Sequence, residues 1–440
     1  MNLGAAKLSA TLLAGLSEPK RGQLSVREQF RLRPTKRSLL VTLAMAVILA
    51  FGIFLRIYPS ATFKSVGYDE HGYVVFLKQI KAAGVLNYEK VVQVYVEKQY
   101  GRPDAIVPAT RVGFLMPAYW CGELFRLPPF QALRLLSCIS SIAMLGVCAV
   151  FAYRVGGAIP MLGLSVLVAT APLQIYLAQR ALIDGYFALL AVTAVWLAWE
   201  NLQRPRHWGW LGTYSGILAL LVLTKENAAF VVFAISGTLL LSRFLRFGTV
   251  TPHLLVATML GPALAVFFLA AMVGGIPEWL HFYAMFVAKS RTNYYSILAQ
   301  DGPWYRYFVD FVIMSPVIVT LAIGRMFQLR KPDAAEIYLT LFLGLNFLCM
   351  ANVTYGMSLR YAAYWDIPLC WLACSQVLML GAKFGRLRAA SVSVALLIAV
   401  GSIGLKQYHR FFVEGEIYDP TTATMVWAAQ LEKEPPPGKR

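Results

Sequence analysis

The side chains best suited to catalysis in this sequence are two adjacent carboxylates, Asp69 and Glu70, in the stretch Gly-Tyr-Asp-Glu-His-Gly-Tyr. Neighbouring carboxylates repel each other, which favours proton uptake by one of them and suits it to act as a general base. The alternative is structural, with Asp69 as the N-cap of a helix and Glu70 in its first turn. The adjacent His71 is a weak metal candidate, because neighbours in sequence rarely converge on one ion.

Charged residues recur at three other places where apolar segments meet. Arg180 and Asp184 are spaced i to i+4, which predicts that they share one face of a helix. Lys225 lies between two short apolar segments, and Arg360-Tyr361 opens another. Each position has an ordinary structural explanation, as a buried ion pair or as a side chain that reaches the membrane surface. Each cation also suits the binding of an anion such as phosphate.

The elements that must position these residues are membrane helices. The 440-residue chain is 58% hydrophobic and 14% charged, with a mean hydropathy of +0.59. A soluble domain cannot bury that much apolar surface, whereas helices in lipid can expose it. The net charge of +18 fits Lys and Arg kept on the cytoplasmic side and touching anionic lipid, so we expect membrane lipid and no nucleic acid as a partner.

The apolar segments predict an all-α polytopic membrane protein, a bundle of about eleven transmembrane helices. We expect a basic cytoplasmic tail at residues 1–37, a transmembrane domain at 38–405 and an outer-face tail at 406–440. A long outer loop at 59–130 holds the acidic pair and is expected to contain short surface helices, one of them at Val74–Val85. The predicted spans are Leu39–Tyr58, Ala132–Ala152, Ile159–Leu177, Ala181–Trp199, Trp208–Leu223, Ala228–Phe244, Leu254–Val273, Tyr307–Ile323, Ile337–Ala351, Tyr361–Leu380 and Ala389–Leu405.

Short basic connections orient these spans. The N-terminal tail and four basic connections (204–206, 243–246, 325–331 and 383–388) fall on one side under this count, which the positive-inside rule makes cytoplasmic. The opposite, outer face then collects Asp69, Arg180, Asp184, Lys225 and Arg360. Acids and cations together suit transfer from a lipid phosphate, because a base can activate an acceptor hydroxyl while cations stabilise charge on the leaving phosphate.

In this order the residues resemble the GT-C class of integral-membrane glycosyltransferases, closest to the protein O-mannosyltransferases, the lipid A aminoarabinose transferases and the RgtA-like group. The resemblance covers the chain from about Leu39 to Leu380. Its marks are Asp69-Glu70, Ala132-Leu133-Arg134-Leu135, Arg180 with Asp184, Leu223-Thr224-Lys225, Gly302-Pro303-Trp304-Tyr305 and Arg360-Tyr361.

The resemblance implies inverting transfer of one sugar from a polyprenyl-phosphate donor to an acceptor hydroxyl of a glycolipid, a polysaccharide or a protein. It implies an active site on the periplasmic face of a bacterial inner membrane, with Asp69 as the base and Glu70 and Asp184 as further catalytic acids. The implied donor-phosphate ligands are Arg180, Lys225, Arg360 and Tyr361. Relatives often carry His/Lys-Pro-Pro in the first outer loop. Here that stretch departs from the pattern, and Arg111 replaces the cation.

Three points stay open in the sequence. A transporter or flippase of lipid-linked sugars also has many spans, but it predicts polar or broken span centres, whereas the charges here gather at one face. A non-catalytic membrane subunit is the other alternative, and it predicts that Asp69 is dispensable. No cofactor follows from the sequence, and a divalent metal, with His71 as a ligand, is left as a possibility.

Overall fold

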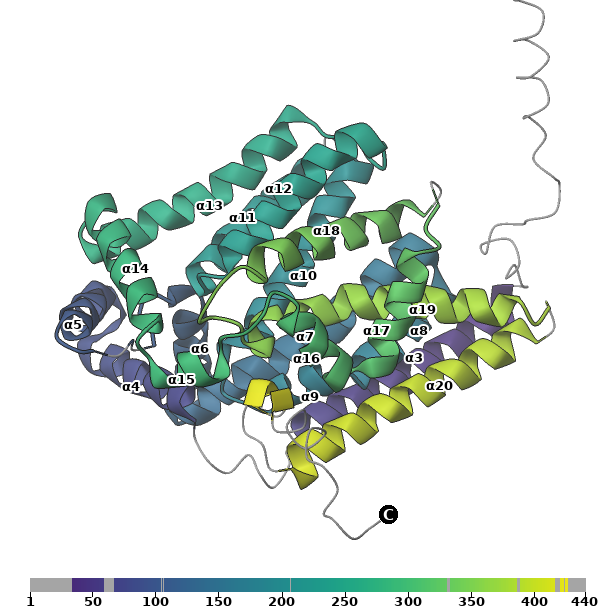
Figure 1. Cartoon of the computed structure of the whole chain (residues 1–440), viewed down its shortest axis with the longest axis horizontal. Helices are drawn as coiled ribbons and strands as arrows, with labels where there is room; N and C mark the ends of the chain where they lie inside the picture. The colour runs from purple at the N-terminus through teal and green to yellow at the C-terminus, as the bar shows by residue number, and fades with distance from the viewer. Residues whose placement is uncertain are drawn as a thin grey trace, which may run out of the picture.

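The computed structural model describes residues 34–58, 67–103, 105, 107–205, 207–330, 333–385, 388–415, 420–422 and 424–425. Throughout these residues the regular structure is helical, which confirms the predicted all-α class (Figure 1). The predicted basic tail falls outside the described residues as far as residue 33. Residues 34–37 already belong to the first described helix.

Seven helices in the described residues are long and apolar enough to cross a membrane. Two further helix pairs pass the same test as bent spans, and two shorter apolar helices complete the set. They coincide with the eleven predicted segments. The long helices are α3 (Pro34–Ile57), α7 (Pro129–Gly156), α10 (Ile183–Gln203), α12 (Ala228–Leu245), α13 (Pro252–Val273), the pair of η3 (Leu359–Trp365) with α19 (Asp366–Ala382), and α20 (Ala389–Tyr408), which continues into η4 (His409–Glu414). The shorter helices are α11 (Trp208–Thr224) and α18 (Ala334–Met350).

Two of the spans are broken at prolines. α8 (Ala158–Ala169) and α9 (Pro172–Ala178) meet at 63°, and α16 (Arg306–Met314) and α17 (Pro316–Met326) meet at 119°. Pro172 and Pro316 each occupy the first turn of the second helix, where a missing N–H costs nothing, and each disfavours helical geometry in the residue before it. Irregular backbone at membrane depth requires partners inside the protein.

Arg56 supplies those partners at the first break. Its guanidinium is fully buried and donates to the carbonyls of Val168 and Ala169 at 3.0 and 3.2 Å, which are the last carbonyls of α8. It also donates to Ser141 Oγ on α7 at 2.8 Å. The positive charge therefore sits at a helix C-terminus, where the backbone dipole favours a cation, and it joins α3, α7 and α8.

Short helices gather at one end of the bundle. Within the predicted loop 59–130 lie α4 (Tyr68–Ala83), η2 (Val85–Asn87), α5 (Tyr88–Tyr100) and α6 (Val112–Phe125), and α14 (Ile276–Ser290) and α15 (Tyr294–Ala299) follow α13. Figure 1 shows α4, α5 and α14 beside each other at one side of the molecule. α4 packs against α5, α6 and α7, so the acidic pair in its first turn is fixed to the body of the bundle.

Candidate active site

Four charged side chains form a continuous ionic chain where α4, α10, η3 and the α11–α12 turn meet. Asp69 Oδ2 lies 3.2 Å from Arg360 Nη2, and Arg360 Nη1 lies 3.9 Å from Asp184 Oδ2. The other Asp184 oxygen accepts a hydrogen bond from Lys225 Nζ at 2.5 Å. Arg360, Asp184 and Lys225 are buried, whereas the Asp69 side chain is 31% exposed. The row of four charges therefore reaches solvent at one end only, at the Asp69 carboxylate, which is the predicted base.

Tyr361 completes this cluster from the same turn as Arg360. The Lys225 ammonium lies 3.8 Å from the centroid of the Tyr361 ring, within the range of a cation–π interaction. One helical turn of η3 thus supplies both a guanidinium and an aromatic face. The two carboxylates stand in the first turns of α4 and α10, where the helix dipole favours negative charge.

Glu70 belongs to a separate, fully buried group. Its carboxylate accepts hydrogen bonds from Arg180 Nη2 at 2.5 Å, from the Ala181 N–H at 2.8 Å and from the Gly67 N–H at 2.7 Å. These contacts tie the start of α4 to the turn before α10. The side chain of Glu70 is inaccessible to solvent, so the adjacent carboxylates differ in their surroundings.

Two sequence expectations fail at this point. Arg180 and Asp184 do not share a helix face, because α10 begins only at Ile183 and Arg180 lies in the turn before it. Arg180 pairs with Glu70 instead. The N-cap of α4 is Gly67, which removes the interpretation of Asp69 as a capping residue and places it inside the first turn.

Arg111 forms a third ionic group beside the cluster. Its guanidinium binds both oxygens of Glu226, at 3.3 and 2.9 Å, and donates to the Tyr73 hydroxyl at 2.5 Å. Burial opposes its charge, but the Glu226 carboxylate outweighs that effect and raises the pKa of Arg111 above its ordinary value. Sequence reasoning did not include Glu226 or Tyr73 in the site. The available signals were the position of Glu226 next to Lys225 and of Tyr73 one turn after Asp69.

Gly113 explains how α6 reaches the α11–α12 turn. A Cβ atom at this position would lie 2.6 Å from Thr224 Oγ1 and 2.9 Å from the Leu223 carbonyl carbon. Only glycine permits this approach of the two backbones. The approach places Arg111, the N-cap residue of α6, within reach of Glu226.

The ammonium of Lys225 is buried, and its pKa lies below that of an ordinary lysine. Burial lowers the pKa of its ammonium to about 8, and the nearby Arg111 and Arg360 charges act in the same direction. The Asp184 carboxylate opposes them. The site therefore holds an amine that changes charge close to physiological pH.

A metal site is not evident in the part of the chain that the structure describes. No three His, Cys, Asp or Glu side chains gather there in a group that fits a metal ion. His71, the weak candidate, is exposed on the first turns of α4.

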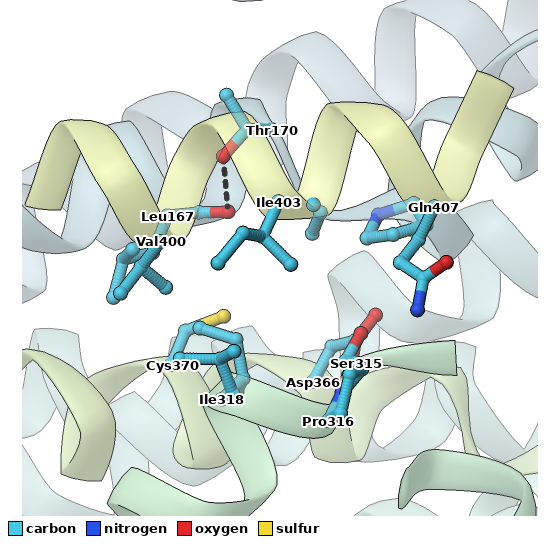
Figure 2. Close-up of a pocket in the computed structure, with 14 residues that line it drawn as sticks. Leu167, Thr170, Ser315, Pro316, Ile318, Asp366, Cys370, Val400, Ile403 and Gln407 are labelled. Carbon is cyan, nitrogen blue, oxygen red and sulfur yellow. Dashed lines mark hydrogen bonds between the residues drawn. The ribbon is translucent and has the colours of Figure 1, made fainter. Parts of the chain in front are cut away.

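A small pocket lies apart from the ionic cluster, at the two broken spans. It is lined by residues of α8, α9, α17, α19 and α20, and Figure 2 shows Asp366, Cys370 and Ile318 opposite α20. The Asp366 carboxylate is buried and accepts a hydrogen bond from Gln174 Nε2 at 3.2 Å. None of the cluster's charged residues lines this pocket.

No protein-family model matches the sequence, and no curated protein matches it. Solved structures do match the fold. The structure of ArnT from Cupriavidus metallidurans bound to undecaprenyl phosphate aligns with a TM-score of 0.56 at 15% identity, covering 92% of this chain and 82% of that one. The apo structure of the same protein aligns with a TM-score of 0.52 at 14% identity, covering 89% and 76%.

An archaeal enzyme gives a second match. The oligosaccharyltransferase of Archaeoglobus fulgidus in its apo form aligns with a TM-score of 0.59 at 12% identity over 84% of this chain. This chain spans 55% of its length. ArnT, a lipid A aminoarabinose transferase, and the oligosaccharyltransferase are both GT-C glycosyltransferases. The chain has the fold of GT-C integral-membrane glycosyltransferases, as its sequence motifs predicted.

Proposed function

We propose that this protein is a glycosyltransferase that moves a single sugar from a polyprenyl-phosphate donor to an acceptor hydroxyl. The observation that carries the proposal is the ionic chain from Asp69 through Arg360 and Asp184 to Lys225, at one end of a GT-C bundle. Two proteins with this fold support the donor class. ArnT has been solved bound to undecaprenyl phosphate, and the archaeal oligosaccharyltransferase in complex with a dolichol-phosphate.

In the proposed reaction, Asp69 takes the proton of the acceptor hydroxyl. The acceptor oxygen then forms a bond to the anomeric carbon of the sugar from the face opposite the phosphate. The bond between that carbon and the phosphate oxygen breaks, and its electron pair leaves with the polyprenyl phosphate. Configuration at the anomeric carbon is inverted, and the negative charge that Asp69 loses reappears on the leaving phosphate.

Arg360 and Lys225 stabilise the negative charge that develops on the leaving phosphate. Arg360 and Lys225 are buried side by side around Asp184, where fixed charges act more strongly on a developing anion than they would in water. Asp184 contacts both cations, and together with Asp69 it balances their two positive charges. Tyr361, against Lys225, and Arg111, beside the cluster, are the remaining proposed contacts of the donor phosphate.

The Asp69–Arg360 contact implies that the donor binds before Asp69 acts on the acceptor. A donor phosphate that binds Arg360 competes with Asp69 for the same guanidinium, so donor binding releases the carboxylate toward the acceptor. Glu70 and Arg180 lie too deeply in their own pair to share this chemistry. We propose that they hold Asp69 in position, which changes the catalytic and phosphate-binding roles that the family resemblance implied for them.

The proposed active site faces the periplasm of a bacterial inner membrane. The proposal is supported by the basic connections, because under the positive-inside rule the candidate site is expected on the face opposite to them. The acceptor class is a glycolipid, a polysaccharide or a protein, as in the resemblance.

The test is a transfer assay with purified protein, radiolabelled polyprenyl-phosphate sugars and an acceptor extract from the cell envelope. Asp69→Asn is the test variant. Asp333→Asn is the matched control, because Asp333 also pairs with an arginine, Arg325, at 3.0 Å but lies at the start of α18. Label that moves to an acceptor only with Asp69 intact supports the proposal. Movement of intact donor across vesicles without cleavage would support a flippase instead.

A further inference from the structure

Residues 420–422 and 424–425, here called the C-terminal segment, make buried polar contacts beside the candidate site. Among its described residues, Thr421 and Thr424 are fully buried. Thr421 Oγ1 accepts a hydrogen bond from the Leu359 N–H at 2.9 Å and lies 3.0 Å from Ser358 Oγ. Thr424 Oγ1 donates to Asp310 Oδ1 on α16 at 2.8 Å. The segment therefore connects α16 to the first residue of η3.

The Leu359 N–H needs a partner from outside its own helix. The first amides of any helix lack intrahelical acceptors, and Ser358, the N-cap of η3, makes no side-chain capping bond. Thr421 supplies that acceptor from 62 residues further along the chain. Thr421 therefore accepts a hydrogen bond from an amide at the helix N-terminus, as an N-cap side chain does, but from a distant part of the sequence.

The residue after Leu359 is Arg360, the centre of the ionic chain. η3 is a seven-residue 3₁₀-helix, a form whose hydrogen bonds are poorer than those of an α-helix. Small rotations of its first turn would move the Arg360 guanidinium relative to Asp69 and Asp184. A hydrogen bond that fixes this turn therefore also fixes the guanidinium.

The far side of the connection is itself anchored. Asp310 lies 3.6 Å from Arg306 Nε, and Arg306 Nη2 donates to the Ala299 carbonyl at 2.5 Å. The Met357 N–H donates to the Gln300 carbonyl at 2.9 Å, which joins the same loop to the approach of η3. Thr424 thus attaches the C-terminal segment to a buried carboxylate that also lies beside Arg306.

We propose that Thr421 is a positioning residue for Arg360 and that the C-terminal segment is required for donor binding without touching the donor. This inference rests on the proposed function, because it assigns Arg360 to the donor phosphate. It predicts a defect in donor affinity, not a general loss of the fold, when the Thr421 hydroxyl is removed.

The test compares Thr421→Val, which keeps the shape and removes the hydroxyl, with Thr421→Ser, which keeps the hydroxyl. Thr320→Val is the control, an exposed threonine on α17 whose hydroxyl bonds within its own helix. We expect Thr421→Val to raise the donor KM roughly tenfold, the effect of losing one buried hydrogen bond, with kcat changed less. Thr421→Ser and Thr320→Val should stay within about twofold of the parent protein.

Two further measurements separate positioning from simple destabilisation. In an Arg360→Lys background, Thr421→Val should add less than about twofold, because coupled residues are not additive. Hydrogen–deuterium exchange at the Leu359 amide should speed up in Thr421→Val and not in Thr421→Ser. If Thr421→Val does not fold, Thr424→Val tests the same connection at its other end and should also raise the donor KM.

A donor KM unchanged in Thr421→Val, or a full additional loss in the Arg360→Lys background, would overturn the inference. Failure of the proposed function looks different. In that case the parent protein itself would transfer no sugar from the polyprenyl-phosphate donors, while exchange at the Leu359 amide would still report whether Thr421 holds η3.

Discussion

The Arg360 guanidinium lies between two carboxylates, 3.2 Å from Asp69 and 3.9 Å from Asp184. Asp184 is buried and keeps a second cation, Lys225, whereas Asp69 is partly exposed. Of the two acids, only Asp69 can leave its partner and meet a substrate from solvent or lipid. In the proposed reaction, Arg360 would exchange the Asp69 carboxylate for the donor phosphate while it keeps its contact with Asp184.

Arg360→Lys should weaken donor binding more than acceptor binding. Lysine keeps the charge but cannot contact both carboxylates through two nitrogens. We expect a donor KM roughly 10- to 100-fold higher, the range for loss of a charge-assisted hydrogen bond, and an acceptor KM near that of the parent protein. Steady-state kinetics with each substrate varied in turn would show this. Equal donor affinity in the variant would rule out a phosphate role for Arg360.

Donor binding should weaken as pH rises through about 8. The Lys225 ammonium has a pKa lowered to about 8 by burial, so it is charged below that pH and neutral above it. Since the donor is an anion, its affinity should be about tenfold lower at pH 9 than at pH 7 if the Lys225 charge is essential. Binding titrations across this range would check the slope. Lys225→Arg should flatten the profile, and a step that survives in this variant would assign the titration to another group.

Glu70→Gln should destabilise the protein strongly. The change leaves the buried Arg180 without its carboxylate, and breaking one side of a buried ion pair costs about 3–5 kcal/mol. Glu123→Gln is the matched control, because Glu123 pairs with Lys81 on the surface, where water and salt screen the two charges. Thermal unfolding in detergent would compare the two. Similar melting temperatures would contradict the positioning role of Glu70.

Gly113→Ala should disturb the site from a distance. The added Cβ would overlap Thr224 and the Leu223 carbonyl carbon, which costs about 1–3 kcal/mol or displaces α6. Displacement would separate Arg111 from Glu226 and lower transfer activity together with stability. Gly146→Ala is the control, because no atom outside its own helix lies within 4 Å of that Cβ. If both alanine variants have the same stability and transfer activity, the close approach at Gly113 does not matter for function.

The sequence predicts the bundle and the meeting of its charged turns, because apolar length and basic connections are local signals. It places Asp69, Asp184, Lys225 and Arg360 on one face without showing which acid pairs with which cation. The spacing of Arg180 and Asp184 predicted one shared helix face. The broken span ends at Ala178 and the next helix begins only at Ile183, so Arg180 lies in the turn between them and pairs with Glu70.

Long-range contacts are the part that spacing does not encode. Arg111 meets Glu226 from 115 residues away because Gly113 admits a backbone that a larger residue would exclude. The contact of Thr421 with the Leu359 N–H likewise joins residues 62 positions apart in the sequence. Such contacts follow from packing, which a single sequence does not display.

The most direct test of the central claim is single-turnover transfer by Asp69→Asn at saturating donor. The variant should bind the donor at least as well as the parent protein, because Arg360 loses its competing carboxylate. Its transfer rate should fall by about 10²- to 10⁴-fold, the usual contribution of a general base, while Asp333→Asn stays near the parent rate. Full turnover by Asp69→Asn, with donor consumed and acceptor labelled, would contradict the assignment of Asp69 as the base.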